Sequence, residues 1–464
     1  EAIVTVPDAI ASSKTIYPLT LSVAGQVSVA ATAKIDVTGK GYPASDYYGP
    51  EFESDDHLSG GHGGKNRHNG EAHGRFERAR LAGSAGDARG VDYPARGGGI
   101  IEVYAATIDL DGSLLADGEP GYFRGGAGGS VHIETDVISG LETASISTAG
   151  AGTQHTSASN ERYYAGAGGR ISLYASDVSG YQGSLSAASG SGDVSGAGTI
   201  YVQDPLQQFG HLTVDNAGRL APASSTPLRS VGRHTIVGVY QATPGVWKIE
   251  VEGTPWHDSD NPYDYGVDGL WVDLQASETA SAHYQIVSNS NNVLEVHTSD
   301  DLRNALGREL VGVQTFATLT LGTGGSLDIG EDRLVVLDTA NSAFANETSL
   351  LAGEISQELL QLAGTGGASV TLRHTPPLSD LVLDDLGEST LRFADQVRVN
   401  QLTISSGEVY FDGGLNITGA VDIAADAYVQ ALAITATDLT VAGTATLEAS
   451  TVDLLGDLTV QDEA

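Results

Sequence analysis

Short alternating strands that follow a small residue and a glycine recur along the first half of the sequence, and this repetition constrains the fold more than any other feature. The pattern appears in "GGIIEVYAATIDLDG" from Gly98, "GGSVHIETDVISG" from Gly128, "GGRISLYASDVSG" from Gly168 and "AGTIYVQDPLQ" from Ala197. Apolar residues at alternate positions have the period of a strand with one buried face. The aligned apolar pairs are Ile101 and Val103, Val131 and Ile133, Ile171 and Leu173, and Ile200 and Val202. Between them stand residues expected to face the opposite side: Glu102, His132, Ser172 and Tyr201.

A tighter rhythm of apolar i, i+2 pairs follows residue 395, with a step of five to seven residues, mostly six, apart from two places where a weaker pair, Ala427/Val429 or Ala445/Leu447, fills in. It runs through Val397/Val399, Leu402/Ile404, Val409/Phe411, Leu415/Ile417 and Val421/Ile423, and then through Leu432/Ile434, Leu439/Val441, Val452/Leu454 and Leu458/Val460. A helix has a different period, and hairpins have longer strands with wider turn spacing. Short strands joined by tight corners are typical of a parallel β-helix, in which each coil stacks on the one before it.

These patterns predict an all-β fold: a right-handed parallel β-helix solenoid in two stretches with an inserted β-rich domain. The predicted boundaries are 1–220 for the glycine-rich stretch, with a long loop at 41–97, 221–350 for the insertion and 351–464 for the second stretch. Stacked corners explain the glycines, because a corner residue with positive φ, or without room for a Cβ, must be glycine. The insertion contains all three tryptophans, and short helices are expected at 299–310, capped by Ser299, and within 348–364.

An acidic loop, "HDSDNPYDYGVDG" at 257–269, is the candidate calcium site. Its oxygen ligands are Asp258, Asp260, Asn261, Asp264 and Asp268. Closely spaced carboxylates and amides near a glycine suit calcium, although the loop lacks the final glutamate of an EF-hand. The alternative is a solvated acidic turn. No other cofactor is expected.

Aromatic residues in and beside this loop are the candidate glycan site. Trp256, Tyr263, Tyr265 and Trp271 are able to form a stacking platform for sugar rings, and the alternative is that they belong to a core.

The long loop contains two further clusters. Four histidines, His57, His62, His68 and His73, fit either a transition-metal site or a solvated loop, and their spacing matches no zinc signature. His68, Glu71, Arg75, Arg78 and Arg80 fit an ion-pair patch that covers one flank or end of the solenoid.

Charge and composition exclude several classes of function. The chain has 59 acidic and 23 basic residues, a net charge of −36, which repels nucleic acids and anionic membranes. No stretch reaches the roughly 18 apolar residues of a membrane helix, and the absence of cysteine excludes disulfides. No hydrolase or phosphate-binding motif is present, and Glu102, His132, Ser172 and Tyr201 form no acid and base pair by sequence. The chain also lacks methionine and ends within its repeat pattern, so we expect it to be part of a longer protein.

The segments "GGSVHI", "GGRISLY" and "GAGTIYV", and the ladder after 395, resemble glycine-rich β-helical regions of very large bacterial cell-surface and secreted proteins, such as adhesins and filamentous surface proteins. The resemblance covers about residues 15–220 and 365–464. It implies an extracellular, non-catalytic structural or adhesive segment. Its expected partners are copies of itself, assembled head to tail or laterally, further repeats of the same chain, and cell-surface glycans. Two alternatives are a glycan-binding adhesin segment and a polysaccharide lyase or hydrolase.

Overall fold

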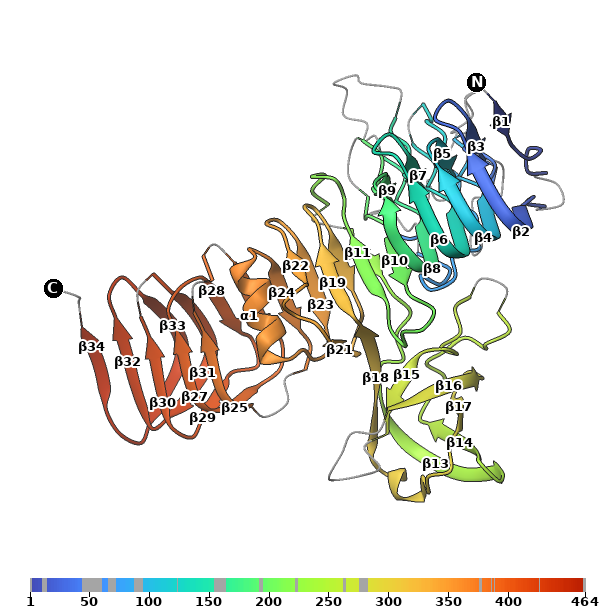
Figure 1. The fold of residues 1–464 in the computed structure, drawn as a ribbon. Coiled ribbons are helices and arrows are strands. Elements are labelled where there is room, and N and C mark those ends of the chain that lie inside the picture. The colour runs from blue at the N-terminus through green and yellow to red at the C-terminus, as the bar shows by residue number, and fades with distance from the viewer. Residues whose placement is uncertain are drawn as a thin grey trace. The chain divides into compact units, whose positions relative to one another are not determined.

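The computed structural model describes residues 2–10, 15–43, 61–65, 72–86, 95–122, 124–153, 164–191, 195–221, 224–261, 264–274, 283–374, 378–384, 386–387, 389–424 and 426–461. The chain forms two compact units (Figure 1). The first unit comprises Glu1–Leu228, Pro262–Asp264 and Phe316–Leu327. The second unit comprises Arg229–Asn261, Tyr265–Thr315 and Asp328–Ala464.

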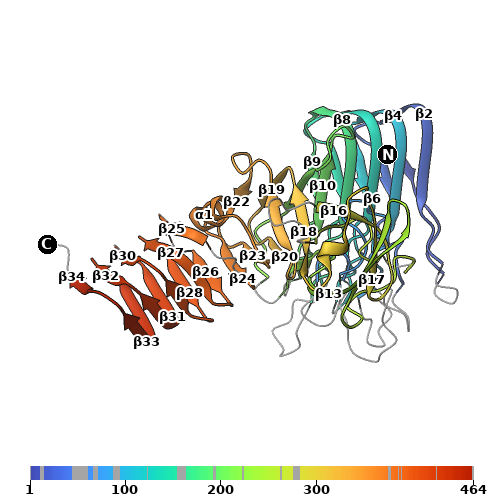
Figure 2. The same cartoon turned by 90° about the horizontal axis from the view of Figure 1, so that it is seen from below.

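Two parallel sheets form most of the first unit, and successive strands of the chain belong alternately to one sheet and the other. The longer strands lie side by side in Figure 2 and are β2 (Leu19–Val29), β4 (Ile100–Leu110), β6 (Ser130–Gly140), β8 (Arg170–Tyr181) and β10 (Thr199–Gln203). The short strands are β1 (Ile3–Val4), β3 (Lys34–Asp36), β5 (Ser113–Leu115), β7 (Ser145–Ser147) and β9 (Ser184–Ser186). The longer sheet continues through β11 (His211–Val214), which is antiparallel to β10, and then β19 (Thr318–Leu321). Two further short strands are β12 (Thr226–Pro227) and β20 (Ser326–Asp328).

The register of the longer sheet confirms the alignment of the sequence repeats. Ile101 lies opposite Val131, Val131 opposite Ile171, and Ile171 opposite Ile200. These side chains are buried and belong to one apolar core. Equivalent residues of successive repeats therefore lie over one another inside the sheet.

The glycines before each strand are required by close backbone contact rather than by positive φ. A Cβ at Gly128 would lie 1.8 Å from the carbonyl oxygen of Thr148, and a Cβ at Gly168 would lie 1.8 Å from that of Ala187. Neither glycine is among the residues with positive φ. The amides are used instead to join neighbouring glycine segments, since Gly128 N donates to the carbonyl of Ala167. Of the two predicted reasons for glycine, the structure shows the lack of room for a side chain at these positions.

Six antiparallel strands of the second unit close into a ring. The pairing order is β13 (Arg233–Thr243), β14 (Val246–Val251), β17 (Val293–His297), β16 (His283–Asn289), β15 (Trp271–Asp273), β18 (Glu309–Phe316) and back to β13. Its core contains Trp247 and Trp256 together with aliphatic side chains from the six strands. The ring spans a narrower range than the predicted insertion, because parallel strands resume at β19.

The helix predicted at 299–310 is wrong in length. Only a 3₁₀ turn, Arg303–Ala305, is present, and it begins after Leu302 without a side-chain cap from Ser299. Gly307 adopts φ of +77°, which ends the helical turn, and Leu310 is buried in strand β18. The helical spacing of Leu302, Leu306 and Leu310 therefore came from residues of two different elements, a 3₁₀ turn and the start of a strand.

The rest of the second unit contains one helix and further strands, of which those from residue 349 onward pair with one another in parallel. Helix α1 (Gln357–Thr365) confirms the second predicted helix, and its N-cap Ser356 accepts a hydrogen bond from Leu359 N at 3.2 Å. The strands are β21 (Arg333–Val336), β22 (Ala343–Phe344), β23 (Ser349–Ala352), β24 (Ser369–Leu372), β25 (Leu378–Leu383), β26 (Thr390–Phe393), β27 (Val397–Ile404), β28 (Glu408–Phe411), β29 (Leu415–Ile417), β30 (Ala420–Ile423), β31 (Tyr428–Ala436), β32 (Asp438–Ala442), β33 (Thr446–Leu454) and β34 (Leu458–Gln461).

The register after β26 explains the six-residue rhythm. Val397 lies opposite Leu415, Leu402 opposite Val421, and Val409 opposite Val429, so partners are 18 to 20 residues apart. Three apolar pairs therefore occupy each repeat. Phe393 and Phe411 stack inside the unit with ring centroids 5.0 Å apart.

No helix in the described part of the chain has the length and hydropathy needed to cross a lipid bilayer.

Candidate functional site

Polar and aromatic side chains cover the outward face of strands β4, β6, β8 and β10 in the first unit. Glu102, His132, Ser172 and Tyr201 lie opposite one another across the four strands, as the alignment predicts. Two residues further along is a second row, formed by Tyr104, Glu134, Tyr174 and Gln203. The titratable and aromatic groups that contact one another on this face make it the candidate site.

Residues 72–86 cover the first of these rows. Ala79 N donates to Ser172 Oγ at 3.0 Å, and Arg80 Nε lies 2.7 Å from Glu102 Oε1. Phe76 packs edge-on against Tyr201 with ring centroids 5.1 Å apart. The first row is therefore largely removed from solvent.

The arginines of this segment match the predicted ion-pair patch in part. Arg80 pairs with Glu102 on the sheet, and Arg75 Nε donates to Asp264 Oδ1 at 3.0 Å. Arg78 is exposed. His68 and Glu71 lie outside the described residues.

His132 connects the buried row to the exposed one. Its Nδ1 is 2.7 Å from Ser172 Oγ, and its Nε2 is 2.9 Å from Glu134 Oε1. Burial lowers the pKa of His132, although Glu134 opposes the shift, so the ring is neutral at neutral pH. A carboxylate only accepts hydrogen bonds, so Nε2 carries the proton and Nδ1 accepts from the Ser172 hydroxyl. A continuous chain of donors runs from Ala79 N through Ser172 and His132 to Glu134.

This chain of donors has the composition of a nucleophilic triad but not its access. Ser172 and His132 are both buried, and Ser172 Oγ already accepts from Ala79 N. Only Glu134 reaches solvent, with 52% of its side chain exposed. What the chain does in this geometry is to hold the Glu134 carboxylate in one orientation.

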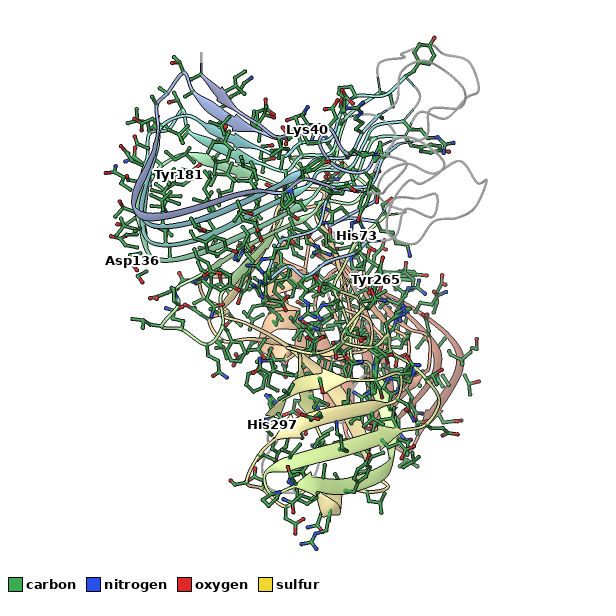
Figure 3. The ribbon with its side chains drawn as sticks, turned by 90° about the vertical axis from the view of Figure 1, so that its right-hand side faces the viewer. Lys40, His73, Asp136, Tyr181, Tyr265 and His297 are labelled. Atoms are coloured by element: carbon green, nitrogen blue, oxygen red, sulfur yellow. The ribbon has the colours of Figure 1, made fainter. Side chains whose placement is uncertain are left out.

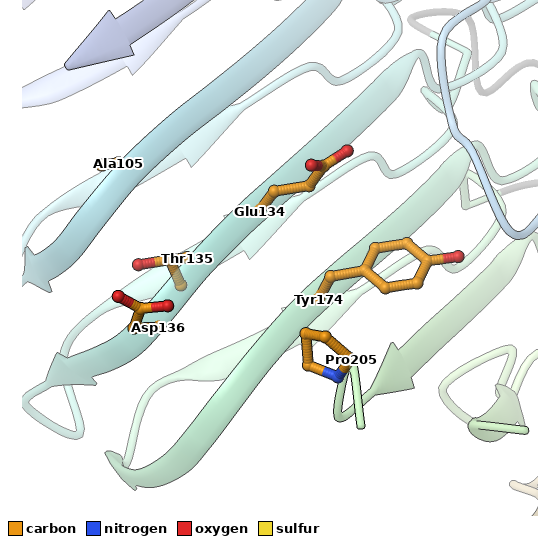
Figure 4. A pocket seen from close by; sticks show the side chains of 6 residues that line it. All are labelled: Ala105, Glu134, Thr135, Asp136, Tyr174 and Pro205. Carbon is orange, nitrogen blue, oxygen red and sulfur yellow. The ribbon is translucent and has the colours of Figure 1, made fainter. Parts of the chain in front are cut away.

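A shallow depression of about 450 Å³ lies beside Glu134 (Figure 4). Its lining residues are Ala105, Glu134, Thr135, Asp136, Tyr174 and Pro205. Glu134 and Tyr174 project on the same side from neighbouring strands, and Asp136 lies on the outer side of the sheet (Figures 3 and 4). The depression combines two carboxylates, which accept hydrogen bonds, with an aromatic ring and other apolar groups.

The predicted calcium ligands are divided between the two units. Asp264 belongs to the first unit and is paired with Arg75 there. In the second unit, a Cβ on Gly266 would be 3.0 Å from both Asp258 O and Asp268 Oδ1, so the structure brings these two aspartates together.

A positive charge lies against the same turn. Arg229 Nη1 donates to the carbonyls of Gly266 at 2.6 Å and Asp268 at 3.1 Å. Asp258 and Asp260 are exposed, and Asn261 is half-buried. Among the described residues there is no group of three or more acidic or histidine side chains placed to hold a metal ion. Calcium binding at this loop stays a prediction.

Three of the four residues of the predicted glycan platform lie in the described part of the chain, and glycan binding there stays a prediction. Trp256 is buried in the core of the ring, where its Nε1 donates to Val231 O at 2.8 Å, so its face is not offered to a ligand. Tyr265 is half-buried beside exposed His257, with ring centroids 5.5 Å apart, and Trp271 is half-buried on β15. Tyr263 lies outside the described residues.

Two of the four loop histidines are described, and both are buried. His62 and His73 stack with ring centroids 4.6 Å apart, and each places one ring nitrogen near a backbone carbonyl, His62 Nδ1 at 2.8 Å from Gly128 O. Burial holds the pKa of His62 well below its usual value. The expected solvated loop is wrong for these two residues, because both rings pack into the glycine-rich region. His57 and His68 lie outside the described residues.

Comparison with models of protein families, with curated proteins and with solved structures gave no match for the chain.

Proposed function

We propose that this chain is a structural and adhesive segment of an extracellular bacterial surface protein or filament, and that both parallel stretches are wound as a right-handed β-helix. The observation that supports this proposal most directly is the in-register stacking of apolar side chains across successive repeats in both units. Each repeat buries its apolar face against its neighbours, which is how an elongated stack gains stability without a globular core.

Exposed apolar side chains on the last described strand support association between copies. One ladder runs from Leu402 through Val421 and Leu439, all buried, to Leu458 on β34, which is 60% exposed. Val460 on the same strand is 73% exposed. Another layer of the same kind, supplied by a second copy or by further repeats, would bury this row and pair the free strand edge.

Assembly tests the proposal, because a charge on the open layer should interfere with stacking. Val460→Asp is expected to reduce or abolish end-to-end association in sedimentation velocity and negative-stain microscopy. Leu206→Asp is the matched control, since Leu206 is 90% exposed but lies between β10 and β11 in the first unit. Isolated particles for the wild type at all concentrations, or equal effects of both variants, would contradict end-to-end assembly.

A second test of the proposed function measures lateral association in the presence of calcium. The net charge of −36 should keep the proteins apart laterally unless a divalent cation bridges them. We therefore expect bundling when calcium is added and dispersal with a chelator, and Asp258→Asn with Asp260→Asn reports whether the loop at 257–269 contributes.

A further inference from the structure

We propose that the depression formed by Glu134, Asp136 and Tyr174 binds an amino sugar unit of a glycan. This ligand site goes beyond the structural function proposed above, and it lies on residues different from the aromatic group at 256–271. Four features of the depression support the assignment: its fixed aromatic wall, its oriented carboxylate, its unbalanced charge and its size.

Tyr174 provides the aromatic wall. Its hydroxyl donates to Glu77 O at 2.7 Å, and its ring has His132 and Tyr201 as edge-on neighbours at 5.8 and 6.1 Å. The ring is therefore held in place before a ligand arrives, so little side-chain entropy is lost on binding. A pyranose ring has an apolar C–H face that packs against such a ring, and Pro205 adds a second rigid apolar surface.

Glu134 provides an oriented acceptor. His132 Nε2 donates to one of its oxygens at 2.9 Å, and Ser172 fixes the tautomer of His132 from the other side. Asp136 stands two residues further along β6, on the same face and about 7 Å away along the strand. Because ionised carboxylates only accept, the ligand must present donors, as hydroxyl and ammonium groups do.

The charge of the depression selects among sugars. Among the described residues that line it, two are carboxylates and none is basic, and buried His132 is neutral. Arg78 opposes the rise in the pKa of Tyr174 that burial causes, but it is not among the lining residues. An ammonium group balances this charge, whereas a uronate or sulfated sugar would be repelled by it.

The volume of about 450 Å³ fits a ligand of one or two sugar rings. An amino sugar satisfies both parts of the surface at once, with its ring face against Tyr174 and its ammonium group near the carboxylates. A simple metal cation would use the carboxylates and leave the aromatic wall without a function.

The second unit offers a matched control surface. A larger depression of about 810 Å³ at the start of α1 is lined by Ser356, Gln357, Glu358, Gln361, Val382 and Asp384. It also contains two carboxylates, Glu358 and Asp384, but none of the described residues that line it is aromatic. It therefore reports attraction by charge alone.

Titration calorimetry at pH 6 with three tetrasaccharides tests the proposal: glucosamine, N-acetylglucosamine and galacturonate tetramers. The full chain should bind the glucosamine tetramer, and Glu134→Gln with Asp136→Asn should weaken this binding by roughly tenfold to a hundredfold. Glu358→Gln with Asp384→Asn should leave it unchanged. Saturation transfer from aromatic protons to the sugar C–H protons should accompany binding.

Three outcomes would overturn the assignment: equal binding of the glucosamine and N-acetylglucosamine tetramers, binding of the galacturonate tetramer, or an equal loss in both double variants. The absence of binding by the wild type would do the same. End-to-end assembly should be unaffected by the Glu134 and Asp136 substitutions, so its success or failure is independent of this result.

Discussion

Gly168→Ala tests the claim that backbone contact, and not φ, requires glycine before each strand. The new Cβ would lie 1.8 Å from Ala187 O and 2.3 Å from Gly198 N, both of which are backbone atoms. The backbone around residue 168 can avoid this clash only by moving away from Ala187 and Gly198. This movement weakens the hydrogen bonds from Gly198 N to Ala187 O at 2.7 Å and from Gly168 N to Gly196 O at 3.1 Å. Overpacking costs about 1–3 kcal/mol and each of the two disrupted buried hydrogen bonds about 1–3 kcal/mol, so we expect a loss of about 3–9 kcal/mol.

Native-state hydrogen exchange is the assay, because it resolves the two units. A loss of about 4 kcal/mol should speed exchange of the most protected amides of β8 and β10 about a thousandfold. Gly25→Ala is the control: Gly25 has no φ in the left-handed region, and a Cβ there would meet nothing within 4 Å. The control should be neutral or stabilising by up to about 1 kcal/mol. If both variants exchange alike, close packing of the glycine segments is not what excludes a side chain.

Three further predictions concern buried groups and the helix cap. Burial raises the pKa of Asp332 to about 6, against opposing hydrogen-bond donors that include Gln314 Nε2 at 2.8 Å. Asp332→Asn places a donor where these groups need an acceptor, so it should lower the free energy of unfolding of the ring by about 1–3 kcal/mol. Tryptophan fluorescence during urea unfolding measures this loss. As pH rises from 3.8 to about 6, the unfolded chain loses this proton before the folded one, so wild type should lose about 3 kcal/mol that Asp332→Asn does not. The pKa of His62 lies well below 6.5, so protonation of the unfolded chain should destabilise the first unit by up to about 1.4 kcal/mol per pH unit below 6.5, and His62→Gln should remove this slope in hydrogen exchange. Ser356→Ala should cost about 1 kcal/mol and speed exchange in α1, because Leu359 N loses its acceptor, and unchanged protection would contradict the cap.

The sequence predicted the inward-facing residues well, since burial repeats with the strand period. The alignment of Ile101, Val131, Ile171 and Ile200 is the register of the sheet. The same reasoning failed at 299–310, where Leu302 and Leu310 match a helical spacing but belong to a turn and a strand. Apolar spacing over so short a range does not separate these states.

The candidate site was visible only in part for a different reason. The sequence alignment placed His132 beside its partner Ser172 in one row, but it did not give the acidic partner of His132, because Glu134 lies in the next row on the same strand. Alternation along a strand places residues i and i+2 on one face, so Glu134 could have been predicted from the sequence as a partner of His132. Coverage by the segment around Arg80 was predicted only as an ion-pair patch on one flank or end of the solenoid. The contact from Ala79 N to Ser172 was not predicted, because it is a long-range contact from a segment without periodicity.

The two faces of the sheet in the first unit therefore place different requirements on the sequence. Inward positions remain aliphatic from repeat to repeat, because each side chain must pack on an equivalent one in the next layer. Outward positions meet no such requirement, and the row that begins with Glu102 changes from acid to imidazole to hydroxyl to phenol across four strands. A stack that fixes its backbone with one face is free to vary the other, and polar groups from different repeats then lie about 4.8 Å apart without any loop to position them. The contact between Ser172 and His132 uses this spacing, so a ligand site on this face gains its rigidity from the same repetition that builds the sheet.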